Sequence, residues 1–197
     1  MKRPKLHKNQ NRITLVGLSL FFIVGIFFLF NFTFFDQSRN SNTGEFKTIT
    51  KEEALELIAS ASLIEKKEIP KEVWLQSDVL NQSSYKIVWK HGTERPYSSP
   101  LNDEKREGIY VSKACGVEVF SSEHKYDSGT GWPSFTHPIN ESNVILKKDY
   151  SLGIPRTEVL SKCGEHLGHV FNDGPKNKGG KRWCINGEAL EFIPKEE

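Results

Sequence analysis

A cysteine, an arginine and an asparagine at alternate positions form the first pattern that could carry out chemistry. They are Arg182, Cys184 and Asn186 in the 197-residue sequence. Side chains two residues apart on a strand point to the same side, so the guanidinium and the amide would flank the sulfur. A neighbouring cation lowers the pKa of a thiol, and the thiolate is the reactive form. The pattern predicts a nucleophilic Cys184. A strand cysteine that packs as a small hydrophobic residue is the alternative.

Two histidines follow another cysteine at intervals of three residues. The segment Cys-x-x-His-x-x-His comprises Cys163, His166 and His169. These residue types bind zinc, and histidine also transfers protons near neutral pH. The segment therefore indicates a metal site or a pair of proton donors, and two loop histidines without a task are the alternative. The sequence contains no Cys-x-x-Cys pair to complete a closed zinc site.

An aromatic ring lies in a glycine-rich loop. Trp132 is part of the sequence GTGWP at residues 129–133. A tight, rigid loop of this kind can present the ring as the wall of a binding pocket. A core tryptophan that closes a turn is the alternative.

Seven short runs rich in β-branched and aromatic residues must position these groups. They are separated by Gly, Pro, Asn and Asp, and comprise residues 109–111, 117–120, 144–146, 157–160, 169–171, 183–185 and 190–193. This spacing predicts an antiparallel, mostly β domain.

Short helices are expected before the strands. A capping box at residues 50–53 and apolar residues at helical spacing predict one helix over residues 51–66. Pro70 opens a second short helix to about Leu80. The apolar residues of segment 85–89 mark one face of a third helix, which Gly92 stops.

The N-terminal region has the composition of a membrane anchor. Residues 1–12 carry five basic and no acidic side chains, and residues 13–35 are 23 residues without a charge. At about 1.5 Å per residue this segment spans roughly 34 Å, enough to cross a bilayer core of roughly 30 Å. The segment lacks a small-residue cleavage site. We expect a cytoplasmic tail, an uncleaved transmembrane helix over 13–35, and a linker and helix over 36–70.

The exported part would then lie in the periplasm or outside the cell, where disulfides persist. The chain beyond residue 12 carries 22 basic and 25 acidic side chains. This slightly acidic balance argues against nucleic-acid binding.

Seven sequence strings in one order resemble the methionine sulfoxide reductase B family. They are GTERP (92–96), KYDSG (125–129), GWPSF (131–135), RTEV (156–159), HLGHVF (166–171), DGP (173–175) and CIN (184–186). The resemblance covers residues 71–194, nearly the whole predicted exported domain. It implies a fold of two twisted antiparallel sheets and reduction of the R epimer of methionine sulfoxide, free or in oxidised proteins.

The resemblance also implies roles for individual residues. Cys184 would attack the sulfoxide sulfur and become a sulfenic acid, while His166 and His169 would donate to or orient the sulfoxide oxygen. The remaining members of the implied site are the charged partners Arg182 and Asp173, the polar contact Asn186, and Trp132, which would face the substrate methyl group.

Two departures from the family pattern concern the other thiols. Thr130 occupies the place of a resolving cysteine, so we expect reduction by a thioredoxin-like protein or a small dithiol, and no tightly bound cofactor. The family's zinc would be held by two Cys-x-x-Cys pairs, but Ser112 and Leu160 replace the first cysteine of each pair. We therefore expect no zinc, and a disulfide between Cys115 and Cys163 in its place.

Three alternatives remain at this point. The first is a catalytically silent binding module on the same fold. The second is a zinc protein that uses Cys163, His166 and His169. The third leaves the enzyme intact but makes Cys115 or Cys163 the thiol that resolves the sulfenic acid.

Overall fold

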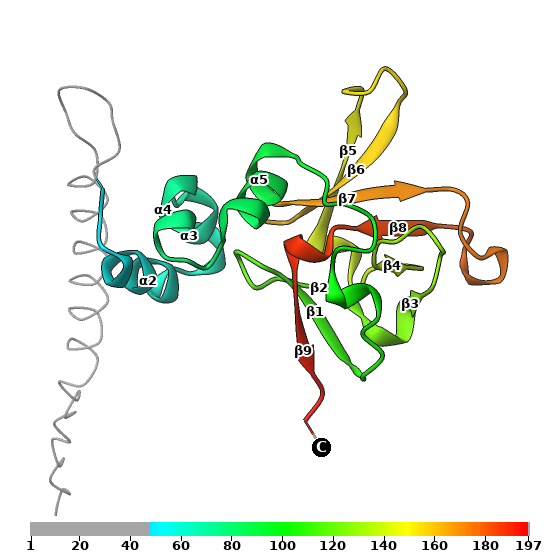
Figure 1. Ribbon diagram of the computed structural model, residues 1–197, viewed down its shortest axis with the longest axis horizontal. Coiled ribbons are helices and arrows are strands. Elements are labelled where there is room, and N and C mark those ends of the chain that lie inside the picture. The colour runs from blue at the N-terminus through cyan, green and yellow to red at the C-terminus, as the bar shows by residue number, and fades with distance from the viewer. Residues whose placement is uncertain (1–47, 197) are drawn as a thin grey trace, which may run out of the picture. The chain divides into compact units, whose positions relative to one another are not determined.

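The computed structural model describes residues 48–196 (Figure 1). The expected cytoplasmic tail, the transmembrane helix over 13–35 and the linker up to residue 47 lie outside the described residues. Within residues 48–196, no helix combines the length and the apolar character needed to cross a membrane.

Four short helices precede the sheets within residues 48–196. They are α2 (Lys51–Ser60), α3 (Leu63–Glu68), α4 (Lys71–Gln76) and α5 (Gln82–Lys90). The prediction of one helix over residues 51–66 is wrong, because the chain is extended at Ala61 and Ser62. Ser62 then starts α3 with a capping box of its own, in which its hydroxyl accepts from the Glu65 amide and the Glu65 carboxylate accepts from the Ser62 amide.

The other helices follow the sequence more closely. The helix that Pro70 opens ends at Gln76 rather than near Leu80. The third predicted helix is confirmed as α5, and its C-terminal cap is His91 in the left-handed conformation, with φ 55° and ψ 36°. The helix therefore stops one residue before the expected Gly92.

The strands form two antiparallel sheets. A three-stranded sheet has the order β2-β1-β9 and contains β1 (Gly108–Ser112), β2 (Glu118–Ser121) and β9 (Leu190–Pro194). A six-stranded sheet has the order β3-β4-β8-β7-β6-β5. Its strands are β3 (Lys125–Tyr126), β4 (Ser134–Phe135), β5 (Val144–Asp149), β6 (Arg156–Ser161), β7 (His166–Phe171) and β8 (Arg182–Ile185). The predicted mostly β fold and all seven predicted strands are confirmed; β3 and β4, with two residues each, were not predicted.

Aromatic side chains join the two sheets. Phe120 of β2 stacks on Phe135 of β4 with ring centroids 4.4 Å apart, and Tyr110 of β1 meets the same ring at 5.0 Å. Trp183 of β8 packs against Phe120 at 6.0 Å, and Ile185 is fully buried. Because β8 directs these two residues into the core, its alternate residues face the other side of the sheet.

Candidate active site

Cys184 lies on the face of β8 that points away from the core. It is paired with Ser134 of β4 and with His169 of β7, and its side chain is partly exposed. β7 and β8 approach closely at Gly168. A Cβ at that position would lie 2.2 Å from the Cys184 carbonyl oxygen, so a side chain does not fit there. The sulfur therefore sits between two strands whose side chains can reach the same space.

Arg182 shares this face and is held in one orientation. Its guanidinium makes a bidentate ion pair with Asp173, with both N–O distances 2.9 Å, and lies 4.4 Å from the ring of Phe171. Asp173 itself is largely exposed. The sequence prediction that Arg182 and Cys184 occupy one side of a strand is confirmed by the alternating burial of β8.

Burial sets the protonation state of Cys184 in the free protein. Removal from water raises the pKa of the thiol, and the charge of Arg182 together with hydrogen bonds from Thr130 and Arg182 lowers it without offsetting the burial. The expected effect of the cation is present, but the net pKa is raised. The resting form of the site is therefore the thiol.

Thr130 lies beside the sulfur. Its Oγ1 is 3.9 Å from Cys184 Sγ and 2.8 Å from the hydroxyl of Ser128, which in turn lies 2.7 Å from Ser134 Oγ. A cysteine at position 130 would therefore be next to Cys184, whereas threonine offers only a hydroxyl. A hydroxyl contains no sulfur, so Thr130 cannot form a disulfide with Cys184 and cannot resolve a sulfenic acid there.

Trp132 is fixed at the edge of the same region. Its indole nitrogen donates to the Glu94 carbonyl oxygen at 3.2 Å, and the ring is partly exposed. A partly exposed ring is consistent with the wall of a binding site, whereas the core interpretation would require full burial.

Asn186 is buried and bonded to backbone on both sides. Its Oδ1 accepts from the Glu94 amide at 3.1 Å, and its Nδ2 donates to the Leu167 carbonyl at 3.1 Å. The side chain thus joins the end of β8 to β7 and to the segment of Glu94. Asn186 therefore stabilises the relative positions of β7, β8 and the Glu94 segment through buried hydrogen bonds.

Glu94 was not among the residues predicted for the site. Its carboxylate accepts from the backbone amides of Gly187 and Glu188 at 2.7 and 2.8 Å. Burial raises its pKa, although these two bonds oppose the shift. The only sequence signal was its place in the string GTERP.

A β-bulge in β7 brings His166 and His169 to one side. Gly168 and His166 pair with consecutive residues of β6, so Leu167 is an additional residue in β7. In a regular strand, residues three apart face opposite sides; here the two imidazole centroids lie 5.5 Å apart. The bulge therefore assembles the histidine pair that the sequence could only suggest by spacing.

Each of these histidines has a carboxylate partner from a neighbouring strand. His169 Nε2 lies 2.8 Å from Asp149 Oδ2, which also accepts from Arg156 at 2.5 Å. His166 Nδ1 lies 2.7 Å from Glu158 Oε1. The sequence analysis did not predict Asp149 or Glu158, because only the fold brings β5 and β6 beside β7.

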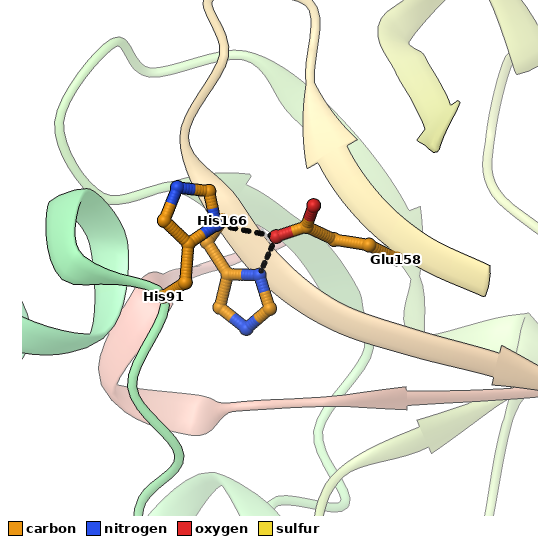
Figure 2. A group of neighbouring side chains, drawn as sticks. All are labelled: His91, Glu158 and His166. Atoms are coloured by element: carbon orange, nitrogen blue, oxygen red, sulfur yellow. Dashed lines mark hydrogen bonds and ion pairs between the residues drawn. The ribbon is translucent and has the colours of Figure 1, made fainter. Parts of the chain in front are cut away.

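A third histidine joins the second pair. His91 Nδ1 lies 2.5 Å from the same oxygen of Glu158 (Figure 2). Burial lowers the pKa of His166 even though Glu158 favours its charged form. Burial raises the pKa of Glu158, but hydrogen bonds from His91 and His166 outweigh it and the net pKa is lowered. The two N–O distances are hydrogen-bond lengths, shorter than the roughly 3.3 Å between two ligands on one tetrahedral zinc ion with 2.0–2.1 Å bonds.

The metal trio suggested by the sequence is not assembled among residues 48–196. Cys163 groups instead with Cys115 and Glu165, whose sulfur and oxygen atoms lie within 4.8 Å of one another, and His166 groups with His91 and Glu158. The described part of the chain therefore does not bring Cys163, His166 and His169 together as one set of ligands.

The Cys115 cluster also lacks the ligands of a closed zinc site. Glu165 already accepts from the amides of Ala114 and Cys115 and from the hydroxyl of Ser161, at 2.8, 3.2 and 2.7 Å. Two thiols and one committed carboxylate do not supply four free donors. The donor set does not fit the zinc that the family resemblance implies.

Cys115 and Cys163 interact directly as buried thiols. A hydrogen bond from Cys115 to the Cys163 sulfur raises the pKa of Cys115, with burial acting in the same direction. The same bond lowers the pKa of Cys163.

Known proteins resemble most of the described chain. Residues 80–194 match the family model described as SelR domain. The chain is 52% identical over 119 residues to a protein of Vibrio cholerae named peptide methionine sulfoxide reductase MsrA/MsrB, and the match covers 60% of this chain and 31% of that protein. It is 50% identical over 120 residues to peptide methionine sulfoxide reductase MsrB of Methanosarcina barkeri, covering 60% of this chain and 84% of the relative. The chain thus spans about a third of the first relative and most of the second.

The raised pKa of Cys184 predicts a slow thiol in the absence of substrate. Alkylation of Cys184 by iodoacetamide, followed by mass spectrometry of its peptide, should keep accelerating above about pH 8.5, the ordinary thiol pKa. Arg182→Gln should slow alkylation at pH 7 several-fold further, because the cation that stabilises the thiolate is lost. A rate that is already at its plateau at pH 7 would contradict the assignment.

Proposed function

The chain belongs to the SelR-domain family of peptide methionine sulfoxide reductases MsrB, which are oxidoreductases, and on this premise we propose that its 71–194 region reduces methionine-R-sulfoxide, free or in oxidised proteins, to methionine. The observation that carries the proposal is the placement of the partly exposed Cys184 beside Arg182 on one side and His169 on the other.

The first step joins thiol and acid chemistry. The Cys184 thiolate forms a bond to the sulfoxide sulfur while the sulfoxide oxygen takes up two protons and leaves as water. Water then attacks the Cys184 sulfur and breaks the S–S bond, so that methionine leaves, one proton is released and Cys184 becomes a sulfenic acid. The sulfoxide sulfur is reduced by two electrons and the cysteine sulfur is oxidised by two. Since the oxygen departs from the substrate only when it is protonated, the step needs a proton donor beside the thiolate. His166 and His169 are the donors that lie on the strand next to Cys184.

The substrate must be oriented by groups of different character. Trp132 offers an apolar face for the methyl group, and the histidines offer hydrogen bonds for the sulfoxide oxygen. Asn186 and Glu94 hold these groups in register through their backbone contacts. Because the methyl group and the oxygen need different walls, the site favours one epimer.

The sulfenic acid is reduced from outside the chain in this proposal. Thr130 is adjacent to the sulfur but has no thiol, and Cys115 and Cys163 are engaged with each other in the turns after β1 and β6. An external thiol would attack the sulfenic sulfur, release water and form a mixed disulfide, which a second thiol then reduces. A thioredoxin-like protein or a small dithiol has the required pair of thiols.

We also propose that Cys115 and Cys163 form a structural disulfide in place of the family's zinc. The support is their proximity, since both sulfurs belong to one buried cluster whose sulfur and oxygen atoms lie within 4.8 Å of one another. The bond would close a loop of about 47 residues, for which the chain-entropy model gives a stabilisation of about 4 kcal/mol.

We further propose that the catalytic domain lies outside the cytoplasmic membrane. The basic tail and the uncharged segment 13–35 support a single membrane span with the N-terminus in the cytoplasm and the catalytic domain outside it. This location would bring the enzyme to oxidised proteins beyond the membrane and would supply an oxidising environment for the disulfide.

Cys184→Ser should abolish reduction of methionine-R-sulfoxide while the fold remains intact, because a serine hydroxyl supplies almost no nucleophile near pH 7. The assay follows separated epimers of a chromophore-labelled methionine sulfoxide. Wild-type protein should consume the R epimer only, and Thr130→Ser should retain activity as the matched control. A Cys184→Ser protein with a tenth of the wild-type rate would show that another group attacks, and an inactive wild-type protein would favour the silent binding module.

Peptide mapping without reduction tests the disulfide and the route of reduction. A peptide that links Cys115 to Cys163 should be present before substrate is added and unchanged after one turnover. Metal analysis of the same sample should find less than one zinc ion per chain. A Cys184-linked peptide that appears only after turnover would instead make Cys115 or Cys163 the resolving thiol.

Protease accessibility tests the location. Protease added outside intact cells or spheroplasts should cut the linker within residues 38–44 and release a soluble, active fragment. Protection of this linker until the membrane is lysed would reverse the proposed orientation.

A further inference from the structure

One carboxylate oxygen connects His166 to a residue outside the proposed machinery. Glu158 Oε1 lies 2.7 Å from His166 Nδ1 and 2.5 Å from His91 Nδ1 (Figure 2). Glu158 and His166 are buried, whereas about half of the His91 side chain is exposed. The three residues come from β6, β7 and the C-terminal cap of α5.

The shared oxygen fixes the protons on both rings. An ionised carboxylate only accepts hydrogen bonds, so each Nδ1 must carry a proton. In the neutral state His166 Nε2 then has a lone pair and can donate only after the ring becomes charged. Within residues 48–196 this buried Nε2 has no hydrogen-bond partner.

We propose that His91 is a positioning residue for the reaction. Its Nδ1 donates to Glu158 Oε1 and holds that carboxylate in place. The negative charge of Glu158, which stabilises the His166 imidazolium, is thereby divided between His91 and His166. This inference rests on the proposed reductase function. His91 does not touch the sulfur in this arrangement; it acts on the acid through Glu158. An exposed residue would thereby set the proton-donating capacity of a buried one.

The conformation of His91 supports a role beyond ending the helix. Its φ of 55° lies in the left-handed region, where glycine and asparagine are the favoured residues. A histidine here accepts a less favourable backbone and reaches a strand residue 67 positions away. The contact with Glu158 accounts for that choice.

The groups around His166 determine the sign of the effect. Glu158 favours the charged ring, whereas burial, His169 and His91 disfavour it. Asp149 lies behind His169 and is itself paired with Arg156, and Cys184 is opposite His169 on β8. Removing the ring of His91 leaves Glu158 to His166 alone, so His166 should become easier to protonate.

Three variants of His91 separate this role from simple packing. His91→Phe keeps a ring but removes the Nδ1 donor, and His91→Gly removes the side chain in a backbone conformation that glycine adopts freely. His91→Asn tolerates the left-handed conformation and places its Nδ2 donor where Nδ1 was, without a titratable ring. His137→Phe, at an exposed histidine outside this cluster, is the control.

The measurement is a histidine titration by two-bond proton–nitrogen NMR on the full chain in detergent micelles, paired with the pH profile of kcat/KM for methionine-R-sulfoxide. Phe and Gly at position 91 should raise the pKa of His166 by about half a unit or more. The kinetic profile should move in the same direction, with KM within about twofold of wild type. Asn at position 91 and the His137→Phe control should remain near wild type.

The outcomes are distinct. An unchanged His166 titration and pH profile in both removal variants would overturn the proposal, even if their thermal stability fell. A protein that shows the titration shift but reduces no sulfoxide would refute the proposed reductase function. The effect of His91 on His166 through Glu158 would still stand as a structural result. An Asn variant whose His166 titration shifts as far as that of the Phe and Gly variants would show that a hydrogen-bond donor at position 91 does not hold Glu158, and would also overturn the proposal.

Discussion

The register of three neighbouring strands is the constraint on which the site depends. Cys184 of β8 lies opposite His169 of β7, and His169 lies opposite Glu158 of β6. A slip of one residue would turn every one of these side chains to the other face. Two contacts hold this register. Trp183 packs against Phe120 on the core side, and Gly168 of β7 lies so close to the Cys184 backbone of β8 that no side chain fits there.

Burial keeps Cys184 and His166 uncharged in the free protein. The pKa of Cys184 is raised and that of His166 is lowered, so the free protein holds a thiol and a neutral imidazole. Transfer of a proton from the thiol to an imidazole would create both reactive forms without changing the net charge of the site. Arg182 lies on the sulfur side and Glu158 on the imidazole side, so each new charge would find an opposite charge beside it.

The sequence predicted the parts of the site that depend on local spacing. The alternate placement of Arg182 and Cys184 and the seven main strands follow from a period of two, which a single strand shows directly. The grouping of His166 with His169 depends on a bulge, and a spacing of three gives no sign of it. Asp149, Glu158 and Glu94 escaped prediction because their partners lie on other strands or segments, 8 to 93 residues away, and meet them only in the folded sheet. The break at Ser62, by contrast, had a readable signal in the capping-box residues Ser62 and Glu65.

The cluster at Cys115 shows how two sheets remain joined when a set of metal ligands is incomplete. The resemblance to the family places zinc ligands at Ser112 and Leu160, neither of which has a thiol. Glu165 is fully buried in the turn between β6 and β7, and its carboxylate accepts hydrogen bonds from Ala114 in the turn after β1 and from Ser161 at the end of β6. A buried carboxylate with all its bonds made links the two segments as a metal ion would, because breaking any bond leaves a buried polar group unpaired. The two remaining thiols then lie close enough to react with each other while the fold does not depend on them alone.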